Sequence, residues 1–187
     1  MEAKEVLRGH VAQIAAMTDE QFDHFFSFFK EQSFKKGQVI ISEGDAVHFE
    51  YFVISGYLKS YIVNDDLKMI VLQFAMPASW TSDYNALYSH NRATISVDCI
   101  TDAQVLCLSN ADREMLCEEL YKAQYFFRWR AKRGYVAALQ RHLSCMYNNV
   151  KFRYEELIRL YPELYSHVPK KVLAAYLGVS RETLSRL

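Results

Sequence analysis

The chain has 187 residues, of which 51% are apolar and 24% charged, and 22 Lys and Arg balance 22 Asp and Glu. This composition is ordinary for a globular protein and excludes a collagenous or low-complexity chain. No run of apolar residues is long enough to predict a membrane-spanning helix, and the acidic start of the chain has no signal-peptide core. We therefore expect a cytoplasmic protein of one or two domains that is not bound to a membrane.

The charge is divided unevenly along the chain. Residues 1–110 carry 8 Lys and Arg against 14 Asp and Glu, whereas residues 111–187 carry 14 against 8. Such an asymmetry favours a basic module that binds a polyanion. Two solvated helical faces that happen to be basic are the alternative that charge alone leaves open.

The cysteines and histidines do not form a recognisable metal site. Cys99, Cys107, Cys117 and Cys145 contain no Cys-x-x-Cys pair, which gives a zinc site or an iron–sulfur cluster little support. Six scattered histidines do not favour a haem site. A disulfide is not expected in a cytosolic protein, so Cys99 and Cys107 are predicted to be buried thiols. We expect no metal and no cofactor.

The first thirty residues have a helical pattern, with an aromatic stripe through Phe25, Phe26 and Phe29. From about Ser33 to Ser109, short β-rich runs alternate with turn signals. The runs cover residues 38–41, 51–54, 57–63, 69–74, 94–100 and 104–108. Several short strands at this spacing predict an antiparallel sandwich or barrel.

After Ser109 the pattern is helical to about Met146, and Ser109 or Asn110 can cap this helix. In its second half, mostly apolar residues recur at alternating spacings of four and three, which is typical of a coiled-coil seam. The seam consists of Tyr125, Trp129, Lys132, Val136, Leu139, Leu143 and Met146. We interpret it as a dimer interface, and packing of the seam against the chain's own barrel is the alternative.

Asn148 and Asn149 interrupt the helical pattern, a short helix is expected over residues 152–160, and residues 168–187 predict a helix-turn-helix. Gly178 suits a turn with positive φ, and Ser180 can cap the second helix. Leu184 and Leu187 are expected to point inward from that helix. The apolar face of the first helix consists of Val172, Leu173, Tyr176 and Leu177.

The predicted second helix has an outward face with the chemistry to read DNA. That face carries Arg181, Glu182, Ser185 and Arg186. Arginine can donate two hydrogen bonds to guanine, and glutamate can accept one from the cytosine amino group. Lys170, Ser180 and Thr183 can bind phosphates and set the register. A solvated, charged helical hairpin is the alternative interpretation.

Together these features resemble the cyclic-AMP receptor / fumarate–nitrate regulator (Crp/Fnr) superfamily of bacterial transcription regulators. The resemblance covers nearly the whole chain and is strongest at residues 176–187. Residues 153–169 look like an effector-orphan branch common in Bacteroidetes. The Gly…Tyr-x-Val-Ile-x-Gly-x-x-Lys pattern of the superfamily's barrel is matched by Gly44, Tyr51, Val53, Ile54, Gly56 and Lys59.

The resemblance implies an α+β fold in three parts. Residues 1–110 would form a sensor domain, a double-stranded β-helix of the cyclic-nucleotide-binding-like jelly-roll type with N-terminal helices. Residues 111–147 would form the dimerisation helix, and residues 148–187 a helix-turn-helix DNA-binding domain of the winged-helix type. The sequence stops at Leu187, within the expected recognition helix, so we expect no wing in it.

The resemblance also implies partners and base-reading residues. Double-stranded DNA and a second copy of the chain are the implied partners, and RNA polymerase and an unknown small-molecule effector are further candidates. Arg181, Glu182 and Arg186 would be the residues that read bases.

The segment that binds cyclic nucleotides in this superfamily is altered here. Family members open it with Gly-Glu and close it with Arg-Ser/Thr-Ala, whereas residues 78–84 contain no Gly-Glu pair and Arg92 is displaced by about one residue. In a strand, that shift turns a side chain to the other face. We therefore expect an effector other than cyclic AMP, or none. Trp80, Asp83, Tyr84 and Arg92 are the candidate pocket residues, with core aromatics and a surface arginine as the alternative.

The sequence thus predicts a homodimeric, sequence-specific transcription regulator and not an enzyme. A small-ligand sensor that acts through a protein partner, with a weak DNA-binding head, is the second hypothesis. A cupin-like enzyme is the third, and His48 and Glu50 are the only close pair in the strand region that could serve it.

Overall fold

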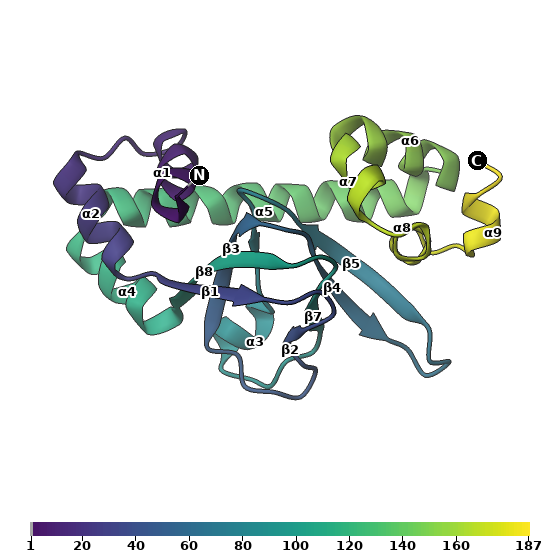
Figure 1. Cartoon of the computed structure of the whole chain (residues 1–187), viewed down its shortest axis with the longest axis horizontal. Helices are drawn as coiled ribbons and strands as arrows, with labels where there is room; N and C mark the ends of the chain where they lie inside the picture. Colours follow the sequence, from purple (N-terminus) through teal and green to yellow (C-terminus); the bar gives the residue numbers. More distant parts are fainter. Residues whose placement is uncertain (1) are drawn as a thin grey trace.

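The computed structural model describes residues 2–187, in the order amino-terminal helices, barrel, long helix and helical head (Figure 1). The amino-terminal helices are α1 (Ala3–Ala12) and α2 (Asp19–Ser27). Thr18 and Gln21 cap α2 with reciprocal side-chain to backbone hydrogen bonds, a capping box. No helix within residues 2–187 is both long and apolar enough to cross a membrane.

The barrel consists of two antiparallel four-stranded sheets with the orders β1-β8-β3-β6 and β2-β7-β4-β5. The strands are β1 (Lys30–Phe34), β2 (Val39–Ile41), β3 (Phe49–Ser55), β4 (Leu58–Val63), β5 (Met69–Ala75), β6 (Trp80–Thr81), β7 (Ser96–Cys99) and β8 (Ala103–Ser109). All six β-rich runs seen in the sequence contain a strand. Strands β1 and β6 and the short helix α3 (Tyr84–Ser89) were not predicted, because β1 is polar and the other two are very short.

Strand β3 shows that the barrel is buried on both sides. Tyr51 and Val53 face the core between the two sheets. Phe52 and Ile54 lie in a second apolar cluster, which the helices complete. Successive residues of a strand point to opposite faces, so two buried faces require a continuous apolar run. This explains why the sequence of β3 shows no alternation between polar and apolar residues.

The chain leaves the barrel at Ser109, which accepts a hydrogen bond from the Asp112 N–H at 3.0 Å and caps α4 (Asn110–Glu119), as predicted. The expected single helix to Met146 is wrong in one respect. It breaks at Leu120, whose backbone is extended, and restarts as α5 (Tyr121–Tyr147). Because of this break, Phe126 and Phe127 of α5 pack against the amino-terminal aromatics and the outer face of β3.

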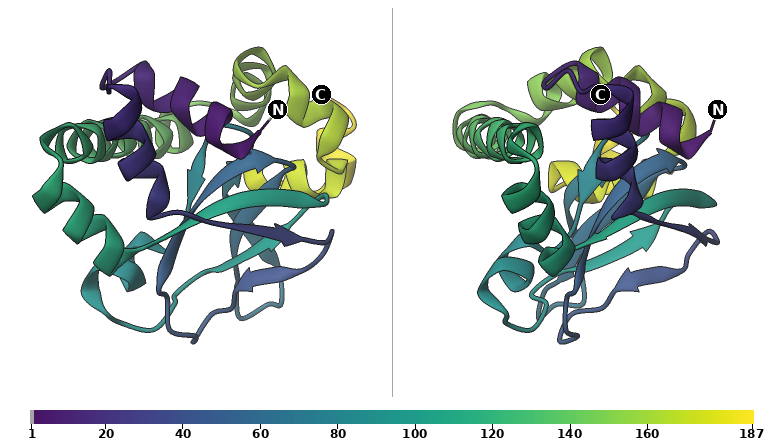
Figure 2. Two further views of the ribbon diagram at one scale, coloured as in Figure 1. Left: turned by 60° about the vertical axis from the view of Figure 1, so that its left-hand side comes forward. Right: turned by 90° about the vertical axis from the view of Figure 1, so that its left-hand side faces the viewer.

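The head follows α5 and consists of α6 (Val150–Leu160), α7 (Pro162–His167), α8 (Lys170–Leu177) and α9 (Arg181–Leu184). Figure 1 shows it at the carboxyl end of α5, away from α1 and α2. Two further views place the head and the amino-terminal helices on the same side of the strands (Figure 2). A third apolar cluster joins Val71 and Phe74 of β5 to Leu173 and Leu177 of α8, so the head is packed against the barrel.

The turn at Gly56 gives a stability test of the barrel. Gly56 has a φ of +91°, and a Cβ there would lie 2.3 Å from the Asp102 backbone oxygen. Gly37 also has a positive φ, of +79°, but nothing lies within 4 Å of its Cβ position. We expect Gly37→Ala to cost about 1 kcal/mol and Gly56→Ala about 2–4 kcal/mol in urea unfolding. Equal costs at the two positions would contradict this packing of Gly56 against Asp102.

Candidate nucleic-acid interface and sensor site

The helix-turn-helix has the turn and the cap that its sequence predicts. Gly178 adopts a φ of +73°, and the Ser180 hydroxyl accepts a hydrogen bond from the Thr183 N–H at 3.1 Å. Leu184 is buried in the head, with 5% of its surface exposed. Leu187 was expected to point inward, but it is 44% exposed. The expectation assumed that the helix continues, whereas α9 ends at Leu184 and a turn follows.

Every residue predicted to contact DNA is exposed on the head. These residues are Lys170, Ser180, Arg181, Glu182, Thr183, Ser185 and Arg186. Hydrogen bonds from its own backbone N–H and from Ser180 lower the pKa of Glu182. Glu182 is therefore a carboxylate at neutral pH, which is the form that accepts a hydrogen bond from a base amino group.

The four predicted effector-site residues do not all lie together. The guanidinium of Arg130, from α5, lies 4.1 Å from the Trp80 ring centroid and 5.9 Å from that of Tyr84. Arg92 is exposed and donates a hydrogen bond to the Gly44 carbonyl at 2.8 Å. The structure thus brings Trp80 and Tyr84 together around Arg130, and it connects Arg92 to the loop that precedes β3.

Asp83 is buried, 2% exposed, and its carboxylate is already hydrogen bonded. It accepts bonds from the backbone N–H of Ala86 at 3.0 Å, which caps α3, and from the N–H of Thr94 at 2.6 Å and Ile95 at 3.2 Å. Burial alone would raise the pKa of Asp83, but these hydrogen bonds outweigh burial and lower it. Asp83 therefore joins α3 to the segment before β7.

The residue pair that the sequence did not reveal is Glu50 and Arg130. Glu50 is 0% exposed and forms an ion pair with Arg130. Burial alone would lower the pKa of Arg130, but the charge of Glu50 raises it above its ordinary value. The partners lie 80 residues apart, so no local pattern pairs them. A glutamate among apolar strand residues is the signal that could have predicted a buried cation.

The enzyme hypothesis rested on His48 and Glu50. His48 is exposed, whereas Glu50 is buried and paired with Arg130, so the two do not form one site. Within residues 2–187, no three His, Cys, Asp or Glu side chains lie close enough together to hold a metal ion.

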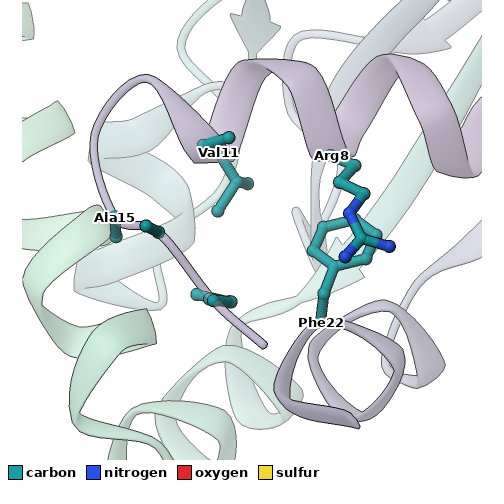
Figure 3. Close-up of a pocket in the computed structure, with 7 residues that line it drawn as sticks. Arg8, Val11, Ala15 and Phe22 are labelled. Carbon is teal, nitrogen blue, oxygen red and sulfur yellow. The ribbon is translucent and has the colours of Figure 1, made fainter. Parts of the chain in front are cut away.

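A small pocket lies between α1 and α2 (Figure 3). Its volume is about 90 Å³, and its lining is apolar except for Arg8, which forms an ion pair with Asp19. Pockets for cofactor-sized ligands are typically about 300–1,000 Å³. We therefore do not assign this pocket to an effector.

Residues 31–119 match the cyclic nucleotide-binding domain family. The matched segment runs from β1 to α4 and includes Glu50, Trp80 and Asp83. No curated protein sequence matches the chain.

Solved structures share the fold over most of the chain. The Catabolite Activator Protein of Thermus thermophilus is 22% identical, over 95% of this chain and 84% of that chain, with a TM-score of 0.59. The c-di-GMP responsive global regulator CLP of Xanthomonas campestris is 15% identical, over 90% and 89%, with a TM-score of 0.69. A protein from Eubacterium rectale, described as a regulator of the Crp/Fnr family, is 15% identical, over 91% and 81%, with a TM-score of 0.64. At these identities the likeness establishes the fold, and the Bacteroidetes branch stays a prediction.

The environment of His10 predicts how stability depends on pH. Burial lowers the pKa of His10 from its ordinary value of 6.5, and the charges of Arg130 and Arg133 lower it further. Its Nε2 accepts a hydrogen bond from the Trp80 indole at 3.2 Å, which requires the neutral ring. As pH falls below about 6.5 the unfolded chain binds a proton that the folded chain does not, so the free energy of unfolding decreases.

We expect the urea midpoint of the wild type to fall between about pH 7.5 and pH 5.5, and to fall less in His10→Gln, whose amide oxygen can still accept from Trp80. His48→Gln, at an exposed histidine, is the matched control and should keep the wild-type slope. Parallel pH profiles for all three proteins would show that His10 does not contribute.

Proposed function

We propose that this protein is a homodimeric, sequence-specific DNA-binding transcription regulator of the Crp/Fnr type. Two findings support this: residues 31–119 match the cyclic nucleotide-binding domain family, and most of the chain shares the fold of solved transcription regulators. The sensor domain would control the head that binds an inverted-repeat operator. The effector of that domain is proposed to be a small molecule other than cyclic AMP, or to be absent.

The observation that carries this proposal is the exposed face of α9 in a capped helix-turn-helix. Arg181 and Glu182 are exposed on α9, and Arg186, which was expected on the same helical face, is exposed in the turn after it. Leu184 holds the helix on the head core. A helix placed in this way can enter a major groove, where arginine and glutamate distinguish base pairs. Thr183 within α9 and Lys170 at the start of α8 would contact phosphates.

The seam of α5 supports a dimer. Tyr125, Val136, Leu139, Leu143 and Met146 are 38%, 50%, 45%, 45% and 68% exposed. The buried face of α5 is a different one, formed by Ala123, Phe126 and Phe127. Large apolar side chains repeated on an exposed helical stripe are typical of a surface that a second helix covers. Two heads related by a two-fold axis would read half-sites about 34 Å apart.

Two of the predicted pocket residues, Asp83 and Arg92, support an effector other than cyclic AMP. Arg92 already bonds the Gly44 carbonyl and Asp83 already bonds three backbone N–H groups, so neither is free for a ligand without a change of partner. We keep Trp80, Asp83, Tyr84 and Arg92 as the candidate effector residues and add Glu50 and Arg130, which surround the same aromatic rings.

The decisive experiment is a selection from random DNA duplexes with purified protein at near-physiological salt. Enrichment of an inverted repeat with G and C at the reading positions is the expected result. An unenriched pool, with tight binding of a small molecule or a protein, would favour the second hypothesis, in which the chain is a sensor module with a weak DNA-binding head.

Replacing a base-reading arginine tests the assignment of α9. We expect Arg181→Ala to weaken binding to the selected operator by about 1–3 kcal/mol and to relax the preference at one base pair, since a bidentate contact to guanine is lost. Lys170→Ala should weaken all sequences alike and reduce the salt dependence, because it would remove a phosphate contact. Arg159→Ala, at an exposed arginine on α6, is the control. An unchanged base preference in Arg181→Ala would exclude its proposed role.

A charge placed in the seam tests the dimer. Leu139→Arg should shift the protein to a monomer in sedimentation, since two buried guanidinium groups would face each other without partners. Ala131→Arg adds the same charge on α5 outside the seam and should leave the dimer intact. Sedimentation of Leu139→Arg as a dimer would contradict the seam.

A further inference from the structure

The head packs against the barrel through a contact that contains none of the functional residues discussed above. Phe74 of β5 and Tyr176 of α8 have ring centroids 4.9 Å apart, and both belong to the apolar cluster shared by barrel and head. Tyr57 stacks on His167 of the head with a centroid distance of 4.5 Å. The orientation of α8, and of α9 after it, is therefore fixed by contacts with the barrel and α5.

Arg141 of α5 lies at the centre of this contact. Its guanidinium carbon is 3.7 Å from the Tyr176 ring centroid, a close cation–π distance. Its Nη2 is 3.4 Å from the Tyr176 carbonyl oxygen and 3.5 Å from the Val71 carbonyl oxygen. One side chain thus contacts the sensor strand β5 and the head helix α8 while it belongs to the long helix.

Arg153 of α6 binds the next carbonyl along. Its Nη2 donates a hydrogen bond to the Leu177 carbonyl oxygen at 3.1 Å. The last carbonyls of a helix have no partner within that helix and carry the negative end of its dipole. Arg141 and Arg153 therefore bind the carboxyl end of α8 with two positive charges, immediately before the turn at Gly178.

We propose that Arg141 and Arg153 are positioning residues for DNA recognition: together they fix the direction of α9 relative to α5, and so they set the half-site spacing that the dimer accepts. This rests on the proposed function, because half-site spacing has meaning only for a dimer that reads an inverted repeat. Arg141 is the more important of the two, since it contacts all three parts of the molecule.

The shape of the contact makes a planar guanidinium necessary. A lysine at position 141 would keep the positive charge but could not stack flat on Tyr176 while it donates to two carbonyl groups on different elements. Substitution should therefore loosen α8 and α9 without changing the exposed residues of α9. The expected result is a head that still reads a half-site but tolerates several distances between half-sites.

The first test needs no DNA. Hydrogen exchange of the amides in residues 170–184 is measured in the full-length wild type, Arg141→Met and Arg141→Lys. We expect exchange about tenfold faster in both variants, because the contacts that hold α8 are lost. Arg159→Met is the matched control, since Arg159 is an exposed arginine of α6. It should exchange like the wild type.

The second test uses inverted repeats of the selected half-site with the spacing changed one base pair at a time. The wild type and Arg159→Met should prefer one spacing. Arg141→Met and Arg141→Lys should bind neighbouring spacings within about twofold to threefold of the best one, because each head then samples several directions.

The outcomes separate this proposal from the proposed function. Wild-type exchange in residues 170–184 of the Arg141 variants, or an unchanged spacing preference, overturns the positioning role while the regulator stands. A wild type that selects no inverted repeat overturns the proposed function, and the exchange result still decides whether Arg141 holds the head. If Arg141→Met does not fold, hydrogen exchange and spacing preference are measured in Arg153→Met instead.

Discussion

The ion pair between Glu50 and Arg130 is the constraint on which the arrangement of the barrel and the long helix depends. Glu50 is fully buried on the outer face of β3, where its neighbours in the strand are apolar. A buried carboxylate without a cation would cost several kcal/mol, so α5 must pass where Arg130 can reach it. Trp80 then covers the guanidinium, with its ring centroid 4.1 Å away. The pair thereby fixes the long helix on the barrel in one register.

This register determines what the two ends of α5 can do. Its amino-terminal half is buried through Phe126 and Phe127, while residues 131–140 are exposed along their whole length. Its carboxyl-terminal part brings Arg141 to the head. A helix held at Arg130 and again at Arg141 spans three turns between the two contacts. Any change in the barrel that moves α5 would therefore move the head as well, since helices transmit displacement as rigid bodies.

The sequence predicted the order of elements well and the contacts between them poorly. Turn residues and apolar runs located six of the strands, and Gly178 with Ser180 located the helix-turn-helix, because these signals are local. The helix break at Leu120 and the exposure of Leu187 beyond the end of α9 were not predicted, because helical periodicity does not indicate where a helix ends. Glu50 with Arg130, and Arg141 with Tyr176, were not predicted. Each joins residues far apart in the chain, and charge pairing across such distances depends on the fold.

The sites that escaped prediction share one physical property. In each, an arginine lies against an aromatic ring and also binds an oxygen: Arg130 with Trp80 and Glu50, and Arg141 with Tyr176 and backbone carbonyls. Arginine suits such joints because its planar, weakly hydrated group can stack and donate at once. Residues 111–187 carry 14 basic residues, and these two are engaged within the chain. Part of the positive charge that first suggested a polyanion partner is therefore structural. Other basic residues of the head, among them Lys170, Arg181 and Arg186, remain exposed.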